Sequence, residues 1–102
     1  MYRYLHTATV EAMQISPETH IPEGEVLTPN TASIASITGW LLALGYTDFE
    51  VAEDGNAFGL SLEAHRKNRL WVGPGWWIVY QHGTFTPVMP QTFADEFQKV
   101  ED

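Results

Sequence analysis

The chain has 102 residues, enough for one domain with a single hydrophobic core, and 44% of them are hydrophobic, as in a globular protein. It contains no cysteine, which excludes disulfides, iron–sulfur clusters, thiolate zinc sites and cysteine nucleophiles. Its 13 acidic and 5 basic residues give a formal net charge of −8, which repels phosphate backbones and anionic headgroups and argues against nucleic acid or a membrane as a partner.

Residues 1–16 are predicted to form one β-strand, because β-branched residues are frequent and the side chains alternate between two mixed faces. Polar and charged residues run through this segment, so it matches neither a signal peptide nor a membrane span, and we expect an intracellular protein. Residues 17–27 contain two prolines, a glycine and three glutamates, a composition typical of an exposed connecting loop.

A helix is predicted over residues 28–44. Thr28 is the expected N-cap, and Pro29 takes the first helical position, where a missing N–H costs nothing. Gly45 is expected to end the helix, since glycine adopts the left-handed conformation without a side-chain penalty. The apolar stripe that faces the core has spacings of three and four and consists of Ile34, Ile37, Leu41 and Leu44, with Trp40 beside it.

Residues 48–64 are predicted to form a β-hairpin, because two segments of alternating apolar residues flank the turn sequence Asp54-Gly55-Asn56. A calcium-binding loop is the other interpretation of this turn. It is disfavoured because the residues before Gly55 supply too few oxygen ligands at alternating positions.

The last third of the chain is predicted to contain short strands at residues 70–72, at residues 76–80 and from Phe85 onward. Turns at residues 73–75 and 81–84 separate them. Prolines near the end of the third strand restrict it to an edge of the sheet, because proline cannot donate a ladder hydrogen bond.

A C-terminal helix is expected from about Thr92, with the Thr92 hydroxyl capping the amide of Asp95, and with Phe93, Phe97 and Val100 facing inward. The complete set of elements predicts a single α+β domain over residues 1–102, with an antiparallel twisted sheet of about five strands. We expect the helix at residues 28–44 to pack on one face of the sheet and the C-terminal helix to cover an edge.

Two separated parts of the chain resemble a family of small tailed-phage and prophage proteins. Thr9–Ile15 reads TVEAMQI, Gly73–Val79 reads GPGWWIV and Gly83–Phe93 reads GTFTPVMPQTF, in the order in which that family carries similar segments. Trp76 stands where the family usually has aspartate, and the turn near His82 is a residue shorter. The resemblance implies a phage or prophage origin and a compact α+β fold. Together with the expectation of an intracellular protein, this origin predicts the host cytoplasm as the location. The family offers no catalytic residues to transfer.

Catalytic and metal-binding patterns are not evident in the sequence. The four histidines, at positions 6, 20, 65 and 82, are never one helical turn apart, so no local metal site is predicted. The serines lack the Gly-x-Ser-x-Gly context of a nucleophile elbow, and Gly73 and Gly75 straddle a proline with no helix behind them to cradle a phosphate. We therefore expect a protein that is not an enzyme and that has no metal or cofactor.

The aromatic residues near the C-terminus are the candidate binding surface. In a strand, Trp76 and Tyr80 share one face and Trp77 lies on the other, so one face could bury its rings while the other meets a partner. The predicted interface residues are Trp76, Tyr80, His82 and Phe85. The alternative left open is that the two helices cover both faces.

These observations lead to three hypotheses about function. The first is a non-enzymatic phage accessory protein that binds a host protein and so interferes with the host. The second is a virion or assembly component that acts by self-association, as a homo-oligomer. The third and weakest is a small-ligand-binding protein, which requires a deep pocket lined by Trp40 or Trp77.

Overall fold

Two helices and eight strands make up the part of the chain that the computed structural model describes, which is residues 2–5, 9–54, 57–63 and 70–99. In chain order the elements are β1 (Tyr2–Leu5), β2 (Thr9–Gln14), α1 (Pro29–Ala43), β3 (Phe49–Asp54), β4 (Ala57–Leu62), β5 (Leu70–Val72), β6 (Trp77–Gln81), β7 (Thr84–Val88), α2 (Pro90–Glu96) and β8 (Gln98–Lys99). The predicted α+β class is therefore confirmed. Neither helix in these ranges is long and apolar enough to span a membrane.

The strands form two antiparallel sheets, so the prediction of one sheet of about five strands is correct only in part: a five-stranded sheet is present, but three further strands form a sheet of their own. The larger sheet has the order β7-β6-β2-β1-β8 and the smaller the order β3-β4-β5. The division occurs at the turn before β6, where the Gly75 N–H donates to the Ile15 carbonyl and the Ile15 N–H donates to the Trp76 carbonyl. These bonds continue the pairing of β6 with β2. β5, which precedes β6 in the chain, does not pair with it and instead contacts β7, where the two sheets meet.

The single strand predicted over residues 1–16 is also wrong, because this segment folds back on itself as β1 and β2. The two strands pair from Tyr2 with Ala12 to Leu5 with Thr9. The connection at residues 6–8 lies outside the described residues. Its sequence contains no glycine, proline or asparagine, so the usual turn signals could not reveal the reversal.

The bounds of α1 agree with the prediction almost to the residue, and Ile34, Ile37, Trp40 and Leu41 are buried as predicted. Leu44, predicted to belong to the apolar stripe, is instead 40% exposed, because it is the C-cap and follows the last helical residue. The Thr28 hydroxyl accepts the Thr31 N–H at 3.1 Å, and Pro29 is the first helical residue. At the other end Gly45 has φ +82, and the Tyr46 N–H donates to the Leu41 carbonyl at 2.9 Å. This closing pattern satisfies carbonyls that the last turn would otherwise leave unpaired.

The predicted hairpin at residues 48–64 is confirmed in its strands, since β3 and β4 pair from Phe49 with Leu62 to Asp54 with Ala57. Two of its three turn residues, at positions 55 and 56, lie outside the described residues. The strand predicted from Phe85 onward corresponds to β7, which is an edge strand of the larger sheet, as its prolines predicted.

α2 begins two residues before the predicted start, with Met89 as N-cap and Pro90 at the first turn. No side-chain hydrogen bond caps it, so the cap predicted for Thr92 is wrong, because Thr92 already lies inside the helix. Val100, predicted to be on its inner face, lies outside the described residues. The helix packs on a face of the larger sheet instead of an edge, because Phe93 is buried with Val10 and Val79.

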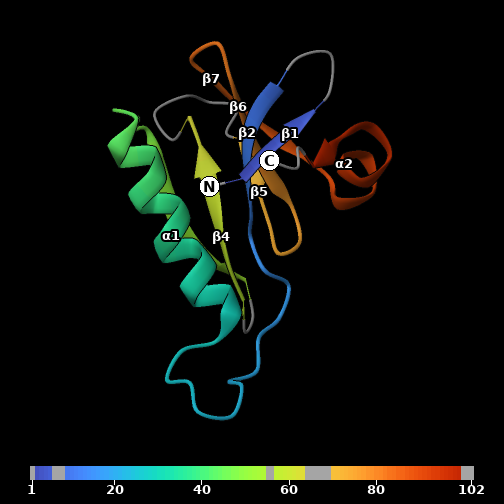
Figure 1. Ribbon diagram of the computed structural model, residues 1–102. Helices are drawn as coiled ribbons and strands as arrows, with labels where there is room; N and C mark the ends of the chain where they lie inside the picture. The colour runs from blue at the N-terminus through green and yellow to red at the C-terminus, as the bar shows by residue number, and fades with distance from the viewer. Residues whose placement is uncertain (1, 6–8, 55–56, 64–69, 100–102) are drawn as a thin grey trace.

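Side chains from α1 and from both sheets meet in the main core. Its buried members are Ile15, Ile34, Ile37, Trp40, Leu41, Leu60, Leu62, Val72 and Ile78. A second cluster of Val10, Ala12, Val79 and Phe93 lies on the opposite face of the larger sheet, under α2. In Figure 1 the two helices accordingly lie on opposite sides of the strands, and the connection from β2 to α1 runs around the lower end of the molecule.

Candidate functional site

A tight hairpin of β6 and β7 positions three of the four predicted interface residues. Gln81 pairs with Thr84, which leaves His82 and Gly83 as a two-residue turn with φ 52 and φ 78. Two successive positive φ values are typical of the type I′ turn that joins strands with the natural right-handed twist. His82 is exposed at the tip of this hairpin.

The rings of Tyr80 and Phe85 lie opposite each other on this hairpin and face the main core. Their centroids are 4.8 Å apart. Trp40 of α1 meets both rings edge-on, at 6.4 Å from Tyr80 and 5.7 Å from Phe85, and Tyr46 lies 4.8 Å from Phe85. Both residues are therefore partly buried members of a ring cluster, and only part of each ring is available to a partner.

Trp76 immediately precedes β6, at the end of the strand opposite the turn, and like Tyr80 it packs against the main core. Four residues of extended chain separate the two, which corresponds to roughly 13 Å. The structure thus brings Tyr80, His82 and Phe85 together near the hairpin turn and leaves Trp76 apart from them. Trp76 is partly buried and packs against the main core, while Trp77 packs against the second cluster, so the two indoles occupy opposite faces as predicted.

An open groove of about 380 Å³ lies where Trp76 meets the edge strand and α2. The residues that line it are Trp76, Val79, Gln81, Thr86, Pro87, Val88, Met89, Thr92, Glu96 and Phe97. Most of these side chains are apolar or uncharged, and Glu96 is the charged one among them. Met89 is 52% exposed and leaves apolar surface at this site accessible to solvent.

Sequence reasoning identified one lining residue of this groove, Trp76, and missed the others. The groove is formed because α2 packs on the face of the sheet next to β7. A helix placed over an edge of the sheet, as the sequence predicted, would not form this groove. Pro90 was the available signal, since a proline at the first position places the helix start directly after Met89.

A second, smaller hollow of about 270 Å³ includes Trp77, and its other lining residues are Met13, Gln14, Ser33 and Ser36. It is open to solvent, and Trp77 itself stacks on Phe93 with centroids 3.8 Å apart. A drug-sized ligand is usually buried over most of its surface. This hollow therefore gives the small-ligand hypothesis little support, and Trp40 lines neither space.

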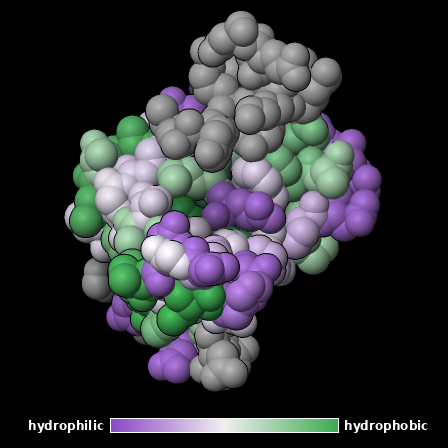
Figure 2. Space-filling view, turned by 60° about the horizontal axis from the view of Figure 1, so that its bottom comes forward, coloured by the Kyte–Doolittle hydropathy of each residue, from purple (hydrophilic) through white to green (hydrophobic). Residues whose placement is uncertain are grey.

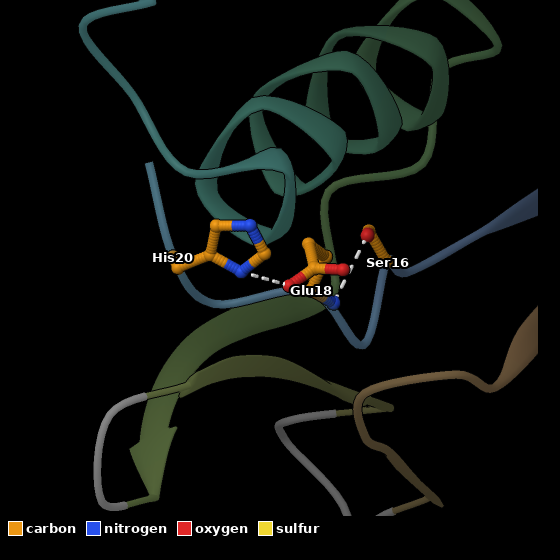
Figure 3. Close-up of polar contacts among 3 residues, drawn as sticks. All are labelled: Ser16, Glu18 and His20. Atoms are coloured by element: carbon orange, nitrogen blue, oxygen red, sulfur yellow. Dashed lines mark hydrogen bonds and ion pairs between the residues drawn. The ribbon is translucent and has the colours of Figure 1, made fainter. Parts of the chain in front are cut away.

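The polar contact that most resembles a catalytic arrangement joins Ser16, Glu18 and His20 near the start of α1 (Figure 3). Glu18 connects the other two: its N–H donates to the Ser16 hydroxyl at 3.2 Å, and its carboxylate contacts Nδ1 of His20. The contacts run from Ser16 to Glu18 and from Glu18 to His20, so the imidazole does not contact the serine hydroxyl, and the arrangement is a local turn at the surface and not an activated serine. In the ranges that the structure describes, no three histidine, aspartate or glutamate side chains gather to bind a metal ion. His6 and His65 lie outside those ranges.

Comparisons with known proteins gave no relative. A scan against models of known protein families found no match, and searches of the curated proteins and of the solved structures also found none.

Proposed function

We propose that this chain is a non-enzymatic binding protein that recognises another protein through the groove between β7 and α2. The observation that carries the proposal is the groove itself, which combines an open shape with an apolar lining that includes Trp76 and the exposed Met89. Exposed apolar surface of this kind marks contact sites, and an aromatic anchor beside it is typical of the residues that dominate binding energy.

The partner would carry an apolar side chain on a basic surface. The chain's formal charge of −8 accelerates encounter with a positive surface and opposes encounter with a negative one. Glu96 in the groove lining places one negative charge directly at the contact.

The origin that we propose for the chain is a phage or prophage, and the partner is then a host protein in the host cytoplasm. This part of the proposal rests on the resemblance of the segments around Val10, Trp76 and Phe85 to small tailed-phage proteins. An accessory role that interferes with a host process follows from such an origin.

Self-association through β7, one of the two edge strands of the larger sheet, is the less favoured alternative. In an antiparallel hairpin, every second residue forms hydrogen bonds to the partner strand. Counting from the two-residue turn, these residues of β7 are Thr84, Thr86 and Val88. The backbone nitrogen of Pro87 therefore points away from β6. An added strand would find no N–H donor at that position. Proline at an edge is a common protection against edge-to-edge pairing.

A pull-down from bacterial lysate tests the proposal with three variants. Met89→Glu places a charge at the groove without touching the core, and Trp76→Ala removes the aromatic anchor. Leu42→Glu is the matched control, because Leu42 is similarly exposed, at 56%, on α1 and does not line the groove.

We expect one protein to be recovered by the wild type and by Leu42→Glu and to be lost with both groove variants. Circular dichroism confirms that each variant is folded. Failure to recover any protein reproducibly, or equal recovery with Met89→Glu, would contradict the proposal. Sedimentation of the pure chain addresses the alternative, since a stable oligomer would favour self-association.

A further inference from the structure

The loop at residues 17–27 exposes more apolar surface than a connection needs. Val26 is 87% exposed, Ile21 56% and Leu27 55%. Three large aliphatic side chains within seven residues are thus in contact with water. Figure 2, which turns the lower end of Figure 1 toward the viewer, shows hydrophobic residues beside hydrophilic ones on this side of the molecule.

Hydrogen bonds hold the start of this loop against α1. The Ser16 N–H donates to the Ser33 hydroxyl at 2.9 Å, and the Asn30 N–H donates to the Glu18 carbonyl at 3.0 Å. Both bonds attach the start of the loop to the first turns of α1. Because the loop also ends at the Thr28 cap of the same helix, its two ends lie close together, as in a compact Ω-loop.

The interior of the loop is also ordered. The Glu25 N–H donates to the Pro22 carbonyl at 3.1 Å, and Gly24 has φ +85, the geometry of a type II turn with glycine at its third position. Figure 3 shows a further contact within the loop, from Glu18 to His20. A loop that is already ordered loses little conformational entropy when a partner covers it, so more of the contact energy appears as affinity.

The charges around the exposed aliphatic side chains identify the chemistry of the partner. Glu18, Glu23 and Glu25 lie in the loop, and it contains no lysine or arginine. A second copy of this chain brings the same formal charge of −8, and an anionic membrane is also negative, so both are repelled. A protein with basic residues around an apolar pocket is attracted instead.

The start of the loop also lies beside the end of the groove. A Cβ built on Gly75 would be 3.9 Å from Pro17 and 3.3 Å from Pro90, so these three residues lie together. Trp76 and Met89 line the groove, and they are the chain neighbours of Gly75 and Pro90. The first residue of the loop therefore lies near two residues that are chain neighbours of the groove lining.

We propose that residues 17–27 form a preformed binding loop, in which Ile21, Val26 and Leu27 enter an apolar pocket bordered by lysine and arginine on a partner protein. The inference rests on the proposed protein-binding function and adds to it a second contact surface and the chemistry of the partner.

A photo-cross-linking experiment identifies the partner first. Benzoylphenylalanine replaces Val26 in one sample and Leu42, the exposed aliphatic control on α1, in another. Each full-length protein is irradiated in bacterial lysate, and the cross-linked product is identified by mass spectrometry. We expect a product from position 26 that is absent from position 42.

Affinity measurements with that purified partner then test the loop. The double variant Val26→Ser/Leu27→Ser is expected to raise Kd at least about tenfold by removing the aliphatic contact, whereas Leu42→Ser leaves Kd unchanged. Glu23→Gln/Glu25→Gln is expected to slow association and to reduce its dependence on salt. All these positions are exposed, so the variants should keep the wild-type Tm.

The outcomes separate this inference from the groove. If the serine variant binds as tightly as the wild type while Met89→Glu binds weakly, the loop inference is wrong and the groove proposal stands. If the serine variant binds weakly and Met89→Glu does not, the loop binds and the groove does not. Absence of a specific cross-link at position 26, or binding that is insensitive to salt, overturns the inference.

Discussion

Asn30 holds three parts of the fold together, and its replacement should be among the most destabilising single changes in the protein. Its side chain is fully buried. Nδ2 donates to the Ser16 carbonyl at 3.0 Å and to the Phe58 carbonyl at 3.1 Å, and Oδ1 accepts the Phe58 N–H at 2.7 Å. One amide thus joins the start of α1 to the exit of β2 in the larger sheet and to β4 in the smaller sheet.

The expected cost follows from the groups that Asn30→Ala leaves without partners. These are one N–H and one carbonyl of Phe58 and the carbonyl of Ser16. Each buried unpaired group costs about 1–3 kcal/mol, and water can reach some of them after the truncation, so we expect a loss of about 3–5 kcal/mol in unfolding free energy. Since a domain of this size is stable by only about 5–15 kcal/mol, the variant would lose a substantial fraction of its stability.

Asn30→Asp has nearly the same shape and tests the hydrogen bonds separately from the packing. Its carboxylate can still accept the Phe58 N–H, but it replaces two donors by acceptors that face two carbonyls. At neutral pH it also buries a charge, so it should be at least as destabilising as Asn30→Ala.

Urea denaturation followed by tryptophan fluorescence measures both effects. With a slope near 2 kcal/mol per molar urea, the expected loss lowers the midpoint by about 1.5–2.5 M. Thr38→Ala is the control on the same helix, because its hydroxyl donates to the Ala35 carbonyl at 3.0 Å in an exposed setting and should change little. If both Asn30 variants stay within about 0.5 kcal/mol of the wild type, the three-way connection is not what holds the sheets together.

Four further predictions concern single positions of the backbone, and thermal denaturation checks each of them. His82→Val should cost about 1–2 kcal/mol, because a β-branched residue is strained at φ 52, whereas His82→Asn should be tolerated; equal stability of the two would count against the type I′ turn. Gly59→Ala should cost about 1–3 kcal/mol, since its Cβ would lie 2.6 Å from the Trp71 ring. Gly39→Ala in α1 should stabilise the protein by about 0.5–1 kcal/mol, because its Cβ would have no atom within 4 Å and alanine favours the helix. A change in stability of the same sign at Gly59 and Gly39 would refute the packing argument. Thr86→Pro should lower Tm by removing a ladder bond to β6, and an unchanged Tm would show that the alternation in β7 is wrong.

Local signals in the sequence predicted the elements whose ends are fixed by neighbouring residues. Thr28, Pro29 and Gly45 determine α1 because capping and the left-handed C-terminal position act within a few residues. The opposite orientation of Trp76 and Trp77 followed from strand geometry alone.

Features that depend on distant partners were not predictable. The division into two sheets is decided where Gly75 and Ile15 pair, 60 residues apart in the chain, and no local pattern indicates it. From the sequence, Asn30 had no role beyond that of a polar residue in the first turn of the helix, although its side chain is fully buried. The partial burial of Tyr80 and Phe85 likewise depends on the position of Trp40, which becomes known only when α1 is placed.

The positions of the two helices on the larger sheet determine where a partner can bind. α1 covers one face of β6 and α2 covers the other, so neither face of this strand is available as a broad contact surface. Exposed apolar side chains lie both in the connections, at Met89 before α2 and at Val26 before α1, and within the elements, at Leu42, Val51 and Trp71. The two positions before the helices are the ones that adjoin the proposed binding surfaces. Because Asn30 binds the Ser16 carbonyl at the start of the loop, the fold that buries the sheet also holds this loop in position. Binding through connections that the core itself orients requires no rearrangement of the sheet, so the affinity for a partner should depend on the exposed side chains and on charge.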